Sequence, residues 1–167
     1  MEERTGFIDM VGVIDNFIKS ALFSRTFREG MALVEETANY LDGEGREVSK
    51  SMVRAEALSY AGSSMRLTTQ LMQIASWLLV MRALREGDMS VEDASEAKYR
   101  IRANEENRPK RSLSDALPED LAALIKHSDR LYDRIARLDD DLFTKDAGKK
   151  VSGAVAQQMA LAKAFGK

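Results

Sequence analysis

Apolar side chains recur every three or four residues in three long stretches of the chain. These stretches cover about residues 20–42, 51–85 and 118–143, and the spacing predicts an amphipathic helix in each. A period close to 3.5 residues favours a left-handed bundle in which the helices cross at small angles. We therefore expect an all-α fold, an antiparallel three-helix bundle with short extra helices and a C-terminal extension.

Breaks in the apolar pattern predict the borders of this bundle domain, which we place at residues 20–143. A weak stripe interrupted by Gly12 predicts that residues 1–19 form a short or frayed helix in a separate N-terminal segment. Residues 104–118 have no apolar period and contain both prolines of the chain, so they are expected to form a linker. Residues 144–167 are expected to form a basic C-terminal tail.

Two local features are predicted inside the domain. Gly43 and Gly45, in the sequence LDGEGRE, predict a loop with left-handed backbone after the first long helix. Ser90, with Asp93 three residues later, resembles a capping box and predicts a short helix that ends near Arg102. The predicted buried stripe of the first long helix consists of Phe23, Phe27, Met31, Val34, Ala38 and Leu41.

The longest predicted helix is apolar over more of its surface than one bundle is expected to cover. One stripe consists of Ala57, Tyr60, Ser64, Leu67, Leu71, Ile74, Leu78 and Met81, and a second stripe beside it consists of Ala61, Met65, Thr68, Met72, Ala75 and Leu79. Such a helix is roughly 50 Å long, so part of its apolar surface needs a partner outside the bundle. We expect a homodimer that pairs through this helix, with its interface at Leu71, Trp77, Leu78 and Met81. For Trp77, a position in the core is the alternative.

The composition is that of an ordinary helical globular protein and excludes several classes of site. The hydrophobic fraction is 44% and the charged fraction is 31%, while aromatic and β-branched residues are few. The chain has no cysteine, which excludes disulfides, thiolate metal sites and a cysteine nucleophile. Its single histidine excludes a histidine-pair metal site. We expect no catalytic, cofactor-binding or metal-binding residues.

Charge and hydropathy indicate a protein of the cytoplasm. The net charge of −2 does not attract nucleic acid, so no direct nucleic-acid binding is expected. The apolar run from Leu71 to Met81 is shorter than the roughly 20 residues that a membrane span needs. The N-terminal residues mix acidic with apolar side chains, unlike a secretory signal peptide. These features predict no membrane span and a cytoplasmic location.

Two polar features could carry chemistry. His127 lacks the surrounding motif of a phosphoacceptor or of a di-iron site, and we expect an ordinary surface histidine. Arg66 with Gln70, and Arg130 with Arg134, share helix faces and could line a pocket that holds a dicarboxylate. Because arginine and glutamine at this spacing usually form a solvated face, a helical-bundle enzyme with an Arg-lined pocket is kept only as an alternative.

The C-terminal tail combines lysines with an apolar stripe at helical spacing. Two hypotheses are open: the tail binds a protein partner as a tethered basic arm, or it packs in cis against the bundle. Because the apolar pattern of the third helix already closes at Leu142, we expect an arm whose removal leaves the melting temperature unchanged. The residues expected to contact a partner are Lys149, Lys150, Val155, Met159 and Phe165.

Two blocks, FREGMALVEETANYLDGEGRE at residues 27–47 and SSMRLTTQLMQIASWLLVMRALREGDM at residues 63–89, resemble the alphaproteobacterial regulator of CtrA degradation (RcdA) family. The resemblance covers roughly residues 28–100 and implies a dimeric three-helix bundle with a flexible C-terminal extension. It implies a non-enzymatic adaptor that brings substrates, including a cell-cycle transcription regulator, to the ClpXP protease after a response-regulator adaptor has primed the protease. The resemblance implies no catalytic residue in this sequence. A purely structural dimeric helical protein is the second alternative.

Overall fold

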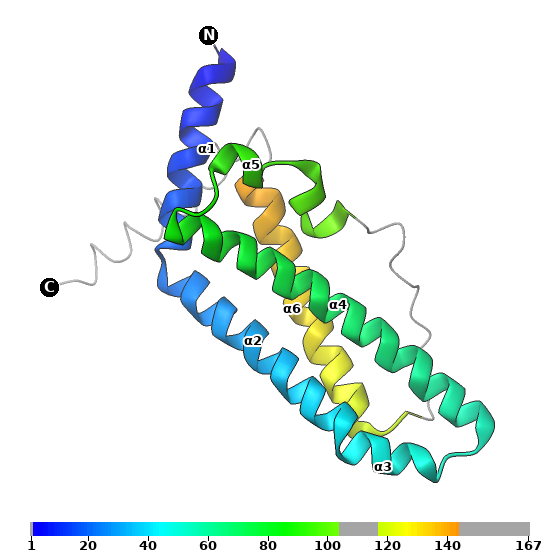
Figure 1. Cartoon of the computed structure of the whole chain (residues 1–167). Coiled ribbons are helices and arrows are strands. Elements are labelled where there is room, and N and C mark those ends of the chain that lie inside the picture. Colours follow the sequence, from blue (N-terminus) through cyan, green and yellow to red (C-terminus); the bar gives the residue numbers. More distant parts are fainter. Residues whose placement is uncertain (1, 104–116, 144–167) are drawn as a thin grey trace, which may run out of the picture.

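The computed structural model describes residues 2–103 and 117–143, and these residues form an all-α structure (Figure 1), as the apolar periodicity predicts. Among the described helices, none combines the length and the apolar character that crossing a bilayer requires. In chain order the elements are α1 (Glu2–Ile18), α2 (Ala21–Asp42), α3 (Glu44–Lys50), α4 (Arg54–Glu86), α5 (Val91–Ala94), the 3-10 helix η1 (Ala97–Tyr99) and α6 (Glu119–Phe143).

The helices α2 and α4 begin and end close to their predicted borders. Ser20 caps α2, because its hydroxyl accepts a hydrogen bond from the N–H of Phe23 at 3.2 Å. α4 ends at Glu86, and its C-cap is Gly87, whose φ of 80° is left-handed and whose N–H bonds back to carbonyls of the last turn. Local capping chemistry therefore sets two of the borders that the sequence predicts.

The helices α2, α4 and α6 pack around the core, and α2 runs antiparallel to the other two (Figure 1). The antiparallel prediction holds for α2 but not for α6, which runs parallel to α4. Gln70 of α4 donates to Ser128 of α6 at 2.9 Å, and farther along both helices Trp77 donates to Asp139 at 2.7 Å. The connection at residues 87–118 is long enough for α6 to begin beside the start of α4, which a tight helical hairpin does not allow.

The buried face of α2 is rotated from its predicted stripe, because Ala38 is exposed. The most buried residues of α2 are Phe23, Thr26, Gly30, Leu33 and Thr37. Gly30 faces Leu78 of α4 so closely that an added Cβ would overlap the leucine side chain. Phe27, Met31, Val34 and Leu41 of the predicted stripe are half-buried and pack against the core, so the stripe forms one edge of the buried face.

The segment predicted as a glycine loop forms the end of α2 and the short helix α3. Neither Gly43 nor Gly45 has the expected left-handed backbone. Gly45 is buried, and an added Cβ would overlap Tyr40 and Tyr60. This glycine is therefore required for packing space and not for a left-handed turn.

The second half of α1 packs onto one end of the bundle. Ile14 and Ile18 belong to the core, and the ring of Phe17 lies 6.2 Å from the ring of Trp77 between centroids. The core therefore begins before residue 20, within the segment expected to be separate. The first half of α1 projects beyond the other helices (Figure 1).

Candidate partner-binding surfaces

One face of α4 carries large apolar side chains that solvent reaches. Leu58, Met65, Met72 and Leu79 are 66%, 72%, 66% and 50% exposed. They follow one another at a strict spacing of seven residues, which keeps them on one stripe of the helix over roughly 32 Å. We call these four residues the α4 stripe. A continuous exposed apolar surface of this kind is typical of a protein-binding site.

Small side chains lie between the members of the α4 stripe. Ala61, Thr68 and Ala75 each follow a large member by three residues, and they are exposed or half-buried. In a pair of helices, small residues at these positions leave holes that receive the large side chains of a facing helix. The α4 stripe therefore has the pattern of a helix-pairing seam that the bundle does not use.

The residues predicted to form the dimer interface lie on another face of α4. Leu71, Trp77, Leu78 and Met81 are at most 4% exposed and belong to the core of a single chain. Helices α1, α2 and α6 pack against α4 and cover this face, so one bundle does cover the stripe that was expected to need a partner. These four residues are therefore not surface anchors. The exposed residues belong to the second stripe of the sequence, which extends back to Leu58.

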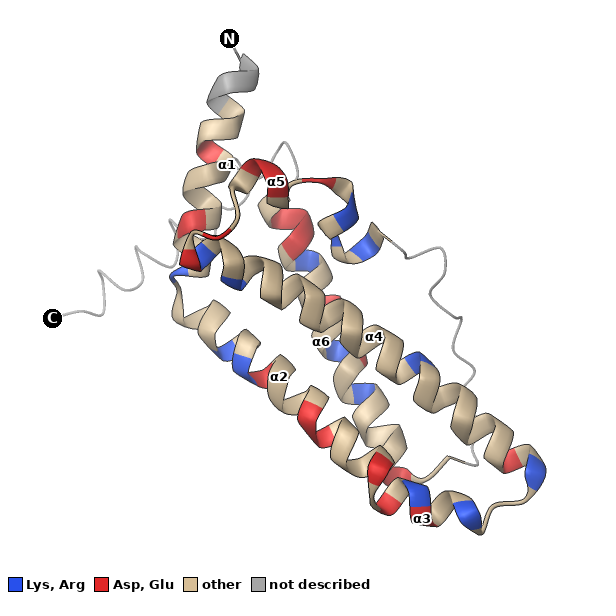
Figure 2. Ribbon diagram, in the orientation of Figure 1, with Lys and Arg blue, Asp and Glu red and all other residues tan. Residues whose placement is uncertain are grey.

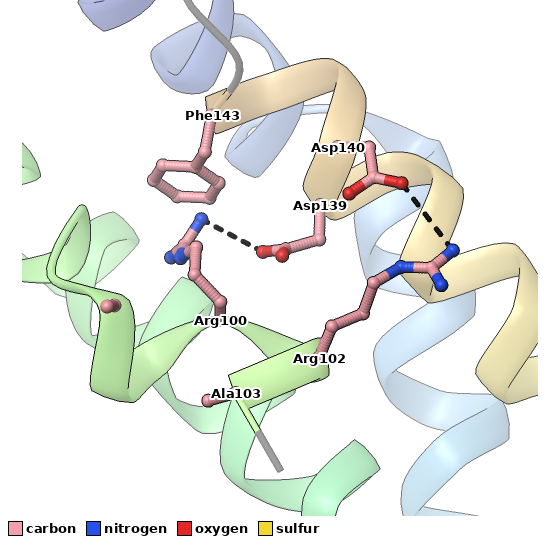
Figure 3. Close-up of a pocket in the computed structure, with 7 residues that line it drawn as sticks. Arg100, Arg102, Ala103, Asp139, Asp140 and Phe143 are labelled. Atoms are coloured by element: carbon pink, nitrogen blue, oxygen red, sulfur yellow. Dashed lines mark ion pairs between the residues drawn. The ribbon is translucent and has the colours of Figure 1, made fainter. Parts of the chain in front are cut away.

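A buried ionic network joins α4, α6 and the α5–η1 segment. The indole N–H of Trp77 donates to Asp139 Oδ1 at 2.7 Å. Arg100 Nη1 lies 2.9 Å from the same oxygen (Figure 3). Arg100 also donates to the carbonyl of Ala94 at 2.6 Å, and its guanidinium carbon lies 3.2 Å from the ring centroid of Phe143. These contacts hold the α5–η1 segment against the end of α6.

The charges of this network are shielded from water. Burial raises the pKa of Asp139 above its ordinary value, although the Trp77 hydrogen bond and the charge of Arg100 oppose this change. Burial also lowers the pKa of Arg100, and the charge of Asp139 opposes that change. In the adjoining hollow of about 340 Å³, Arg102 pairs with Asp140 at 3.5 Å. Both arginines of this hollow pair with aspartates, and the half-exposed Arg102–Asp140 pair adds little to the stability of the fold.

The polar residues considered for an enzyme do not converge on one pocket. Gln70 is buried and donates to α6 at 2.9 Å, whereas Arg66 bonds within α4 at 3.0 Å. Arg134 pairs with Glu29 of α2. Arg130 lines a separate groove between α2 and α6. Apart from Arg130, these side chains make contacts within or between helices.

His127 joins two helices of the bundle. Its Nε2 atom lies 3.0 Å from Oε1 of Glu29 on α2, and Glu29 also pairs with Arg134. Burial raises the pKa of Glu29, but the hydrogen bonds from His127 and Arg134 outweigh this effect and lower the pKa below its ordinary value of 4.5. His127 is therefore more than a solvated histidine, because it contributes to the contact between α2 and α6. The described residues contain no group of acidic and histidine side chains that could hold a metal ion.

The tail residues predicted to contact a partner lie outside the described residues. Their function stays a prediction that rests on the sequence. They are Lys149, Lys150, Val155, Met159 and Phe165.

Comparison with known proteins relates the chain to a family model and to a solved structure. The chain matches a family model described as a protein of unknown function (DUF1465) over residues 14–165. It is similar to the crystal structure of RcdA from Caulobacter crescentus CB15, with 50% sequence identity and a TM-score of 0.64. That match covers 77% of this chain and 97% of the solved chain. No curated protein matches the sequence.

Proposed function

Because this chain belongs to the RcdA family, we propose that it is a non-enzymatic adaptor that delivers protein substrates, such as a cell-cycle transcription regulator, to the ClpXP AAA+ protease. Its proposed partners are the protein cargo, a response regulator or other adaptor of the protease, and a second copy of the chain, all in the cytoplasm. The observation that carries the proposal is the α4 stripe, an apolar surface suited to binding another protein.

A tethering protein needs binding surfaces on a rigid body and no reactive side chain, because it works by raising the local concentration of one protein near another. The α4 helix supplies such a binding surface on a rigid body. It is 33 residues long, and the core holds one of its faces while the α4 stripe lies on another. The buried charges of the bundle are paired with one another, which suits a scaffold.

We propose further that the α4 stripe pairs two copies of the chain in antiparallel orientation. The stripe reads Leu–Met–Met–Leu in both directions about a midpoint at residues 68–69. A two-fold axis at this midpoint brings Leu58 next to Leu79 of the partner subunit and Met65 next to Met72 of the partner subunit. The same stripe then serves both copies, as a self-complementary interface requires.

A charge exchange tests this orientation. M65K and M72E should each weaken the dimer, because each buries a charge at the interface. In an antiparallel pair the two altered positions are neighbours across the interface, so the double variant M65K/M72E should recover part of the lost association. In a parallel pair each altered residue faces the equivalent residue of the partner subunit, so like charges lie next to each other. Sedimentation of the three variants therefore supports the antiparallel pair if the double variant associates better than both single variants, and contradicts it otherwise.

Capture by the protease tests the adaptor role. ClpXP with an inactive peptidase is immobilised, primed with its response-regulator adaptor and mixed with cargo in the presence or absence of this chain. We expect the chain to be retained on the primed protease and to increase the amount of cargo retained. Equal cargo retention with and without the chain contradicts the proposal.

A variant of Arg66 separates the adaptor from an enzyme with an Arg-lined pocket. R66A should keep its fold and its delivery of cargo, because in the described part of the chain Arg66 donates a hydrogen bond to Ser63 of its own helix. If R66A folds normally but loses function, the adaptor proposal loses its support and a chemical role for this arginine gains it.

A further inference from the structure

The N-terminal half of α1 carries an apolar surface that the bundle leaves uncovered. Phe7, Val11, Ile14 and Ile18 fall on one helix face at spacings of four, three and four residues. Ile14 and Ile18 are 0% and 4% exposed, whereas Phe7 is 43% exposed and the adjacent Ile8 is 69% exposed. The stripe that packs α1 onto the bundle therefore continues past the end of the bundle (Figure 1).

The chain leaves α6 at the same end of the molecule. Phe17 of α1 packs against Trp77, and Trp77 bonds to Asp139, which lies one turn before Phe143 at the end of α6. Residues 144–150 can span up to about 24 Å when extended. Phe7 lies ten residues before Phe17, a rise of about 15 Å along α1. The segment that follows residue 150 is therefore within reach of the uncovered end of α1.

Charge also favours the return of the tail to this end. Residues 86–96, in and around α5, contain five acidic and no basic residues (Figure 2). Asp9 of α1 is exposed. Residues 144–167 contain five basic residues and one acidic residue. Opposite charges attract each other over about 8 Å, the screening length at physiological salt.

We propose that residues 151–165 fold back as a helix and cover the exposed part of α1 in cis. Val151, Val155 and Met159 recur at helical spacing and supply an apolar face toward Phe7 and Ile8. A tether of this length gives an effective concentration of about a millimolar, which favours the chain's own tail over a second copy at micromolar protein. The apolar face of the tail and the end of α1 then cover each other until a partner displaces the tail.

Cysteine cross-linking of the full chain tests this arrangement, because the natural sequence contains no cysteine. The test variant is F7C/M159C. The matched control is N16C/M159C, since Asn16 is exposed but lies on the opposite face of α1. After mild oxidation, we expect the test variant to form an intramolecular disulfide in several-fold higher yield than the control, at a level unchanged by dilution. Equal yields overturn the proposal. Disulfide-linked dimers that disappear on dilution also overturn it, because a second copy then covers α1.

Hydrogen exchange gives a readout that needs no change at Phe7. A chain that ends at Phe143 retains all the core residues of the described bundle. Relative to the full chain, its amides at residues 6–13 should exchange several-fold faster, while amides in the middle of α4 keep their rates. Equal exchange of residues 6–13 in the two chains contradicts the proposed cover.

Discussion

Replacement of Met72 by glutamate tests whether the α4 stripe pairs two copies of the chain. Full burial of a leucine or methionine side chain contributes about 1.5–3 kcal/mol. Because Met72 is 66% exposed in the single chain, each copy has roughly 1–2 kcal/mol to gain there on association. The position occurs twice in a two-fold dimer, and each glutamate must also lose water. M72E should therefore weaken the dimer by at least about 3 kcal/mol, or roughly a hundredfold in Kd.

Sedimentation equilibrium over micromolar concentrations measures this change, and circular dichroism checks that the fold is kept. L22E is the matched control, because Leu22 is 42% exposed and lies in the first turn of α2, where a carboxylate is favoured by the helix dipole. We expect the wild type and L22E to dimerise and M72E to be a monomer that keeps the helical circular-dichroism spectrum of the wild type. A wild type that stays monomeric throughout, or an M72E variant that dimerises like the wild type, refutes pairing through the α4 stripe.

Four further predictions concern the bundle and its tail. Trp77→Phe removes the buried donor to Asp139 and should lower the free energy of unfolding by about 2–4 kcal/mol, as measured by urea denaturation. Because the folded pKa of Glu29 lies below 4.5, its pairing stabilises the fold above pH 4.5, and this stabilisation is lost as the pH falls through the lowered pKa. Glu29→Gln should therefore reduce the loss of stability below pH 4.5 in a series of denaturation curves. His127→Gln should lower the free energy of unfolding by at most about 1 kcal/mol in the same assay, since the half-exposed pair of His127 with Glu29 contributes little. It should leave cargo delivery unchanged. Truncation after Phe143 should leave the melting temperature unchanged but weaken delivery, and a melting temperature lowered by many degrees would show that the tail is part of the core.

Apolar periodicity was sufficient to locate the long helices, because it is a local property that packing preserves. The borders at Ser20 and Gly87 were also predictable, since a side-chain cap and a left-handed glycine act within one turn. The family resemblance rested on the same two long helices. These local signals identified α4 as an apolar helix with two stripes.

Which stripe of α4 faces the core was not predictable from hydropathy, because both stripes are apolar. The choice depends on contacts distant in sequence, such as the bond from Trp77 to Asp139 and the close approach of Gly30 to Leu78. The spacing of seven residues from Leu58 does not mark the exposed stripe, because the buried residues Tyr60, Leu67, Ile74 and Met81 keep the same spacing. The parallel direction of α6 relative to α4 was also not predictable from the apolar pattern, because it depends on the length of the connection before α6 and not on the helix itself.

The adaptor role is tested most directly by the initial rate of cargo degradation in a reconstituted reaction. ClpXP, its response-regulator adaptor, ATP and the transcription-regulator cargo are held constant while the concentration of this chain is raised. We predict that the rate rises with the concentration of the chain, reaches a plateau, and falls back to the basal value when the response-regulator adaptor is omitted. A rate that stays at the basal value over all concentrations at which the chain is folded would contradict the proposed function.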